Sequence, residues 1–253
     1  MKAKTIGGKP KKVLSIDFDY FQIVDMETMN DYPDGRDNTP FLSEIVWTHR
    51  YAERPALFDV GFNESEYEKL LSLLENQNNK TPVLISYSHK DIYDFIHEVC
   101  PSDSPLEVVN IDMHHDYSNA NEELDCGNWV SHLQQEYKTF KWRWIANPVS
   151  TEMYEAHELD NLISTSINTS LEKEKYDAIF LCRSDTWLPP HLDSRFENLL
   201  KYFANVFNSV KASNLVMSPR NVTREECERL AKEQAKFLEQ YRAAHLKKPK
   251  SMI

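Results

Sequence analysis

The stretch VVNIDMHHDYSN, residues 108–119, places four ionisable side chains directly after a short apolar run. Residues 108–111 have the β-branched composition of a buried strand. Asp112, His114 and Asp116 follow at alternating positions, and on an extended chain alternate side chains point to the same side. Three such groups together are unfavourable unless a cation gathers them. An isolated motif of this kind is equally consistent with a solvated strand end. The residues at the ends of the other predicted strands are needed to distinguish a metal site from this alternative.

Five further apolar runs resemble this strand, at residues 13–16, 83–87, 142–146, 178–182 and 215–217. Helical patterns lie between them over 63–74, 92–99, 196–207 and 223–246, and the spacings Asn63 to Glu66 and Thr223 to Glu226 are typical of helix N-caps. This alternation predicts an α/β fold, a three-layer α/β/α arrangement with a mostly parallel sheet covered by helices on both faces. We expect a single domain over residues 1–253, with flexible tails at 1–11 and 247–253. Residues 22–62, the least regular stretch, and 150–175, which is polar and partly helical, are expected to form loops over a site.

The composition argues against several classes of function. The net charge of −11 disfavours a protein that binds a nucleic-acid backbone. The chain has only five glycines and shows neither a GxGxxG motif nor a P-loop. Its four cysteines lack CxxC spacing, which predicts reduced thiols rather than a zinc knuckle or a disulfide scaffold. Since no apolar run approaches the roughly 20 residues of a membrane span, we expect a cytoplasmic protein without membrane or nucleic-acid partners.

Four of the predicted strands end in charged or imidazole side chains. Asp17 and Asp19 follow the first strand, and His89 follows the second. The strand at 178–182 is followed by Arg183-Ser184-Asp185. Because the carboxyl ends of parallel strands meet at one edge of a sheet, these groups are predicted to gather there with residues 112–116. Six of them have the chemistry of metal ligands: Asp17, Asp19, His89, Asp112, His114 and Asp116.

This ligand set is rich in carboxylates and contains no thiol. It exceeds the three protein ligands that a catalytic zinc uses. Oxygen-rich sites with some imidazole suit Mn²⁺, and Fe²⁺ or Co²⁺ fit as well. Two ions roughly 3.5–4 Å apart require such a set, with some carboxylates bridging. The sequence therefore predicts a dinuclear site that binds two Mn²⁺ ions.

The motifs that carry these ligands resemble those of the arginase/agmatinase (ureohydrolase) superfamily. Residues 112–116 resemble its Asp-x-His-x-Asp motif, residues 17–19 its Asp-x-Asp motif, and Ser88-His89 its single-histidine motif. In ordinary arginases the Asp-x-Asp segment comes last of the three, whereas here it comes first, which looks like a circular permutation. A closer resemblance is to a ureohydrolase-like family that includes the peptide arginases of ribosomal-peptide natural product biosynthesis. Residues 17–21, Asn128-Trp129 and Arg183-Ser184 carry that likeness, within short motifs over about 12–200.

The resemblance implies an arginase/deacetylase-like fold, circularly permuted, and a set of ligand roles. Asp112 and Asp17 would bridge two Mn²⁺ ions, with His89 and Asp116 completing one site and His114 and Asp19 the other. The implied reaction is hydrolysis of arginine side chains in a precursor peptide, which gives ornithine and urea. The partner is then an arginine-containing precursor peptide, and the net charge of −11 would help to attract a cationic one. We expect peptide arginine to be turned over far better than free arginine.

The residues that would bind substrate are less sharply defined by the sequence. A guanidinium group is best met by a carboxylate, and Asp185 is the nearest match, unless it forms an ion pair with Arg183. Arg183, Ser184 and the loop amide of Asn119 are further candidates for substrate contacts. For proton transfer to the leaving amine, His132 is the first candidate and His115 the second.

Three alternative functions remain open from the sequence. A deacetylase of the same fold would act on acetylated amines and would typically use one zinc. A phosphatase of the haloacid-dehalogenase type also begins with a strand and Asp-x-Asp, but it leaves residues 112–116 unexplained. A non-catalytic homologue would bind peptide without turnover, and the loss of a metal ligand would be its sign.

Overall fold

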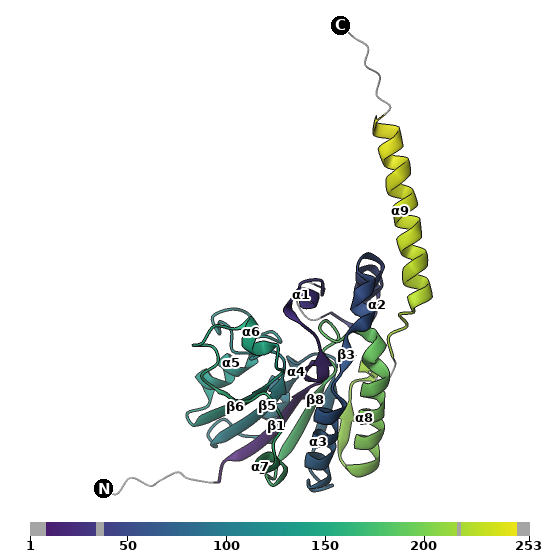
Figure 1. The fold of residues 1–253 in the computed structure, drawn as a ribbon. Helices are drawn as coiled ribbons and strands as arrows, with labels where there is room; N and C mark the ends of the chain where they lie inside the picture. The colour runs from purple at the N-terminus through teal and green to yellow at the C-terminus, as the bar shows by residue number, and fades with distance from the viewer. Residues whose placement is uncertain (1–8, 34–37, 217–218, 247–253) are drawn as a thin grey trace, which may run out of the picture.

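Seven strands form an all-parallel sheet in the order β7-β6-β5-β1-β8-β4-β9. Figure 1 labels the neighbouring strands β6, β5, β1 and β8 of this sheet. The structure is a computed structural model that describes residues 9–33, 38–216 and 219–246. The strands are β1 (Lys11–Asp17), β4 (Val83–Ser86), β5 (Leu106–Asp112), β6 (Phe140–Ala146), β7 (Leu162–Ser164), β8 (Ala178–Cys182) and β9 (Val210–Ala212). The predicted parallel sheet is confirmed.

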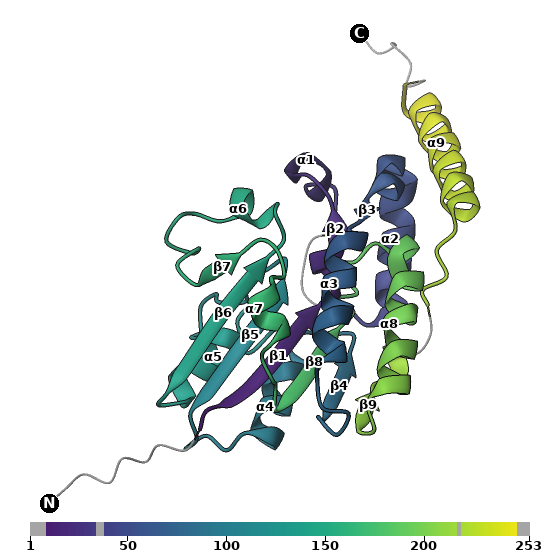
Figure 2. The same ribbon diagram turned by 60° about the horizontal axis from the view of Figure 1, so that its bottom comes forward.

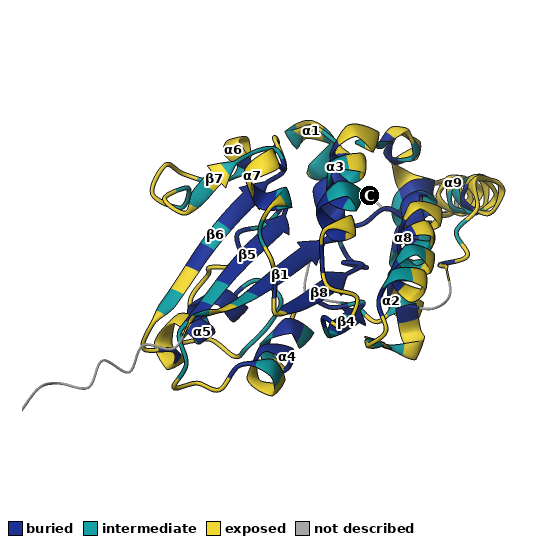
Figure 3. Ribbon diagram, turned by 90° about the horizontal axis from the view of Figure 1, so that it is seen from below, coloured by how far each residue is buried: buried dark blue, intermediate teal, exposed yellow. Residues whose placement is uncertain are grey.

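Helices cover both faces of this sheet. Figure 2 shows α3 and α8 on one face and α4 and α5 on the other. Successive strand residues alternate between the faces: Val13 packs with the α4 and α5 side chains, whereas Leu14 packs with those of α3 and α8. The larger helices are α2 (Pro40–Glu53), α3 (Glu64–Glu75), α4 (Asp91–Val99), α5 (Trp129–Glu136), α8 (Asp193–Val206) and α9 (Arg224–Leu246). The predicted three-layer α/β/α arrangement is therefore confirmed, with the central strands buried (Figure 3).

Short elements complete the chain between these layers. Three single-turn helices are α1 (Met26–Met29), α6 (Ser150–Met153) and α7 (Thr169–Glu172). The 3₁₀ turns are η1 (Phe18–Phe21), η2 (Pro55–Asp59), η3 (Pro190–Leu192) and η4 (Asn214–Val216). Strands β2 (Gln22–Ile23) and β3 (Gly61–Phe62) pair antiparallel in a separate small sheet. In the part of the chain that is described, no helix has both the length and the apolar character needed to cross a bilayer.

Several predicted boundaries hold and others are corrected. The Asn63 and Thr223 side chains cap α3 and α9 by accepting from the backbone N–H groups of Glu66 and Glu226, at 3.2 Å each. The strand expected at 215–217 is wrong: residues 214–216 form the turn η4, and the edge strand is β9, which ends at Ala212. Residues 22–62 contain the 14-residue helix α2, so that stretch is not only loop. Residues 150–175 are partly helical as predicted, with α6 and α7, and they also contain β7.

The tails expected at 1–11 and 247–253 lie mostly outside the described residues, although Lys11 already belongs to β1.

The strand order decides which ligand-bearing ends become neighbours. Strands β5, β1, β8 and β4 lie side by side at the centre of the sheet. Their carboxyl ends therefore bring together Asp112, Asp17, Ser184 and His89, which are far apart along the chain. This shared edge is the location of the candidate site.

Candidate metal centre

His89 lies at the centre of the first group of ligand-type side chains. Its Nδ1 atom is 3.2 Å from Asp17 Oδ2, 3.1 Å from Asp112 Oδ2 and 2.9 Å from Asp116 Oδ2. The opposite ring nitrogen, Nε2, is 2.7 Å from the Ser15 hydroxyl. That contact fixes the ring so that Nδ1 faces the three carboxylates, as partners of a ligating histidine do.

A second group lies next to the first and shares Asp112 with it. The His114 Nδ1 atom is 3.0 Å from Asp19 Oδ2 and 3.9 Å from Asp112 Oδ1. Backbone N–H groups fix both carboxylates: Met113 donates to Asp19 Oδ1 at 3.2 Å, and His114 donates to Asp112 Oδ1 at 2.8 Å. The two groups with metal-site geometry are Asp17-His89-Asp112 and Asp19-Asp112-His114. Asp17 belongs only to the first, so the structure gives its predicted bridging role no support beyond this proximity.

The side chains of this cluster are buried and crowded, and His89 Nδ1 and Asp19 Oδ2 meet their neighbours only at the ion-pair distances given above. Burying a charged group is costly unless it is paired. Four buried carboxylates gathered around two imidazoles are therefore poorly explained as ordinary packing. They fit a site that binds cations, with carboxylate oxygen and imidazole nitrogen as the donor chemistry.

The pKa values of the side chains in the cluster also indicate that positive charge would stabilise it. Burial, followed by the neighbouring carboxylates, raises the pKa of Asp17 well above its usual value. Burial and the Asp112 carboxylate raise the pKa of Asp116 to about 8. Burial opposes protonation of His114, but the Asp19 carboxylate raises its pKa to about 9. The cluster thus retains protons at neutral pH, and divalent cations binding there would displace them.

The chain beyond β5 is bent rather than extended. Asp116 has φ 53°, in the left-handed region that is uncommon for residues other than glycine. Its Oδ2 atom accepts from Trp129 Nε1 at 2.6 Å, and its carbonyl accepts from Val130 N–H at 3.2 Å. The start of α5 therefore holds Asp116 toward His89. Ser184, after β8, has φ 58° and is the second such residue among those described.

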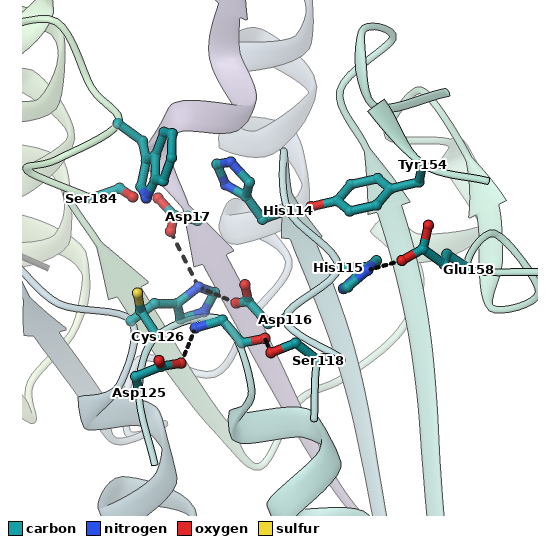
Figure 4. A pocket seen from close by; sticks show the side chains of 13 residues that line it. Asp17, His114, His115, Asp116, Ser118, Asp125, Cys126, Tyr154, Glu158 and Ser184 are labelled. Carbon is teal, nitrogen blue, oxygen red and sulfur yellow. Dashed lines mark hydrogen bonds and ion pairs between the residues drawn. The ribbon is translucent and has the colours of Figure 1, made fainter. Parts of the chain in front are cut away.

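A cavity of about 420 Å³ opens onto the cluster (Figure 4). Figure 4 places Asp125 on one side of it and Tyr154 with Glu158 on the other. The lining side chains belong to Asp17, His89, His114, His115, Asp116, Ser118, Asp125, Cys126, Gly127, Tyr154, Glu158, Ser184 and Trp187. None of the described lining residues is a lysine or an arginine, so the cavity suits a cation rather than an anion.

Asp185 does not line this cavity, and its predicted role as guanidinium anchor or catalytic group is corrected. Arg183 donates to both of its carboxylate oxygens, through Nε to Oδ1 and through an Nη2 contact of 2.9 Å to Oδ2. Both side chains are buried, and the ion pair satisfies the carboxylate. The same contact turns Arg183 away from a substrate role. Ser184 does line the cavity and stays a candidate.

Two further predictions find no support in the structure. His132 is absent from the described lining of the cavity, and its ring packs at 6.2 Å from that of Tyr93 in α4, so its proton-transfer role stays a prediction. Asn119 is exposed in a turn, where its Oδ1 atom accepts from the Asn121 N–H at 3.0 Å.

His115, the second candidate for proton transfer, does line the cavity. Its Nδ1 atom accepts from the Tyr117 N–H at 2.9 Å, so the neutral ring carries its proton on Nε2, 3.4 Å from Glu158 Oε1. Burial lowers the pKa of His115. The backbone N–H of Glu155 and the His115 ring lower the pKa of Glu158, which stays ionised at the cavity wall.

Sequence reasoning missed Asp125, Tyr154 and Glu158 as cavity residues. They belong to the loops after β5 and β6, and no motif or strand-end position marks them. The only sequence signal was the expectation that residues 150–175 lie over a site. The Tyr154 ring packs at 4.1 Å from the His115 ring, and Glu158 lies beside the same imidazole.

Comparisons with protein-family models, curated proteins and solved structures found no match.

Proposed function

We propose that this protein is a dinuclear metal-dependent hydrolase that converts arginine side chains of a peptide to ornithine, with release of urea. The observation that carries the proposal is the pair of ligand groups that share Asp112, in which three buried carboxylates surround two imidazoles. Asp17, His89 and Asp112, with Asp116 adjacent, would hold one ion. Asp19, Asp112 and His114 would hold the other. A single-zinc deacetylase has no use for the second group.

When bound, two divalent cations supply Lewis acidity and lower the pKa of water toward neutrality. The side chains around the ligands then keep the site ordered. Ser15 orients His89, Trp129 fixes Asp116, and Asn110 Nδ2 donates to Asp112 Oδ2 at 2.9 Å. Such partners of the ligands commonly control metal affinity as strongly as geometry does.

Glu158 and Asp125 replace Asp185 as the proposed guanidinium anchors. Both line the cavity, and neither belongs to a ligand group. The His115 ring holds Glu158 at 3.4 Å, and the Gly127 N–H donates to Asp125 Oδ1 at 2.9 Å. An ionised carboxylate can accept two N–H groups from a guanidinium fork. Tyr154 and Trp187 offer apolar wall for the aliphatic part of the side chain.

A peptide substrate fits the charge of this cavity better than free arginine does. Free arginine carries an α-carboxylate, and the lining includes several acidic groups and no described lysine or arginine to meet it. A peptide presents the same guanidinium without that charge. Burying an unpaired carboxylate among carboxylates would be strongly unfavourable.

The test is a substrate panel with Mn²⁺-loaded protein. Arginine-containing peptides, free arginine and agmatine are incubated separately, and urea is assayed together with the peptide mass loss of one CH₂N₂ unit. We expect efficient turnover of peptide arginine, little of free arginine, and intermediate turnover of agmatine because it lacks the carboxylate. An acetyl-lysine peptide with Zn²⁺ serves as the competing assay. Deacetylation without urea release would replace this proposal.

A further inference from the structure

The final helix, α9, packs against the body only through its first half. Cys227 is buried, and Leu230 and Ala231 are partly buried against the core. Gln234 Nε2 contacts His49 Nδ1 of α2 at 3.3 Å. Beyond this point the helix extends past α2 (Figure 1), and most of it is exposed (Figure 3).

The extended half carries an apolar stripe. Phe237 is 65% exposed, Leu238 50% and Tyr241 53%. Cys227, Leu230, Gln234, Phe237 and Tyr241 follow one another at spacings of three and four, the seam of a heptad pattern. The extended half thus continues the stripe that packs on the body, over a length that is marginal as an isolated helix.

A second exposed apolar set lies at the opposite end of the α2–α9 pair. Phe41 is 73% exposed, Leu42 46% and Ile45 41%, all in the first half of α2. The Asn221 N–H donates to Glu44 Oε2 at 2.8 Å, so this part of α2 lies beside the start of α9. The two helices therefore run in the same general direction and are displaced along their length. Each leaves one apolar end uncovered.

We propose that a second copy of this chain covers both ends, in a two-fold dimer. A two-fold axis across the helix pair reverses the direction of the second copy. The free half of α9 from one copy then lies over the free end of α2 from the other, and the reciprocal contact forms at the same time. One self-complementary arrangement covers all four uncovered ends.

The area is adequate for such an interface. Aromatic side chains bury roughly 150–250 Å² each, and the six side chains, three of them aromatic, are 41–73% exposed. Covering them in both copies removes on the order of 1,000 Å² of apolar surface, comparable with the apolar part of a standard interface of about 1,600 Å².

The charges are complementary in the same orientation. The free half of α9 carries Lys236 and Arg242 against one acid, Glu239. The start of the helix carries Glu225, Glu226 and Glu228 against Arg224 and Arg229, with Glu44 beside them. The two-fold arrangement brings the basic end of one copy toward the acidic end of the other. A parallel pairing of two α9 helices would instead place like charges together.

The full chain, loaded with Mn²⁺, is tested by sedimentation velocity over a range of concentrations. We expect a dimer that Phe237→Glu and Phe41→Glu each convert to monomer, and both variants should still fold, because the two side chains are exposed in the single chain. Ile163→Glu, on the edge strand β7 and 46% exposed, is the matched control and should leave the dimer intact. Mixing the two monomeric variants should restore part of the dimer, since one of the two contacts is then intact.

A wild-type chain that stays monomeric at all concentrations overturns the proposal. A dimer that withstands Phe237→Glu also overturns it. If Phe237→Glu dissociates the dimer while Phe41→Glu does not, two α9 helices pair with each other and the α9–α2 contact is wrong. None of these outcomes depends on enzymatic activity.

Discussion

Replacing Asp112 by asparagine should abolish binding of both metal ions, because Asp112 is the one carboxylate that the two ligand groups share. The change keeps the volume of a side chain that is fully buried. It also keeps an oxygen to accept from the His114 N–H, now at 2.8 Å. Asp19→Asn is the matched control: it is equally buried and isosteric but belongs to one group only.

The expected size of the Tm shift follows from the linkage between metal binding and folding. A ligand present at 100 times its Kd stabilises the folded state by about 2.7 kcal/mol per site, so two ions contribute about 5 kcal/mol. In a chain of this length, 1 kcal/mol shifts Tm by about 2–4 °C, so Mn²⁺ should raise the wild-type Tm by roughly 10–20 °C. Asp19→Asn should retain about half of that shift, and Asp112→Asn should show none.

Thermal unfolding with and without Mn²⁺ measures the shift, and elemental analysis after desalting counts the ions. We expect two equivalents in the wild type, one in Asp19→Asn and none in Asp112→Asn. An Asp112→Asn protein that retains two equivalents would refute the shared-ligand arrangement. Equal losses in both variants would show that the ions bind as one cooperative unit rather than as separable sites.

Three other predictions test the surroundings of the site. Ser15→Ala removes the hydroxyl that contacts His89 Nε2, so titration calorimetry should show Mn²⁺ affinity weakened about 10–100-fold at one site; unchanged affinity would contradict the orienting role. Glu158→Gln should lower kcat/KM for an arginine peptide about 10–100-fold, as expected for a lost charged hydrogen bond of about 1.5–3 kcal/mol, while metal content stays at wild-type level; loss of metal instead would mean that Glu158 is a ligand. In the metal-free protein, the pKa of Asp116 is raised to about 8 and that of His114 to about 9, so the folded state binds more protons than the unfolded state across this range and stability should fall as pH rises from about 4 to 9. Denaturant unfolding at pH 6 and pH 9 in a chelator measures this, and greater stability at pH 9 would contradict it.

The parallel sheet was predictable because the apolar patterns of its strands and helices are properties of short sequence segments. The buried strand β8 is a continuous apolar run, β1 and β5 have short apolar centres, and the alternation with helices leaves few other folds. Capping side chains mark α3 and α9 just as locally. The helix α2 was missed because its sequence mixes polar and aromatic residues without a clear apolar stripe. Its helical conformation depends on packing against the rest of the protein.

The candidate metal-ligand side chains come together for a different reason from the one that their sequence spacing suggested. That argument assumed an extended chain, but β5 ends at Asp112, and Asp116 lies in a left-handed turn. Asp19 lies in the 3₁₀ turn η1 rather than in a strand. The side chains meet because β5 and β1 are neighbours in the sheet and the turns after them bend toward each other.

The sequence by itself determined the donor chemistry of the site and the edge of the sheet where it lies, because residue type and hydrophobic periodicity are local properties. Only the tertiary structure decided which carboxylates face the cavity. Asp185 stands in a strand-end motif yet is ion-paired with Arg183, whereas Glu158 stands in no motif and reaches the cavity beside His115. Such pairings join segments that periodicity treats separately, and they depend on strand order and on the paths of the loops, which only the packed chain defines.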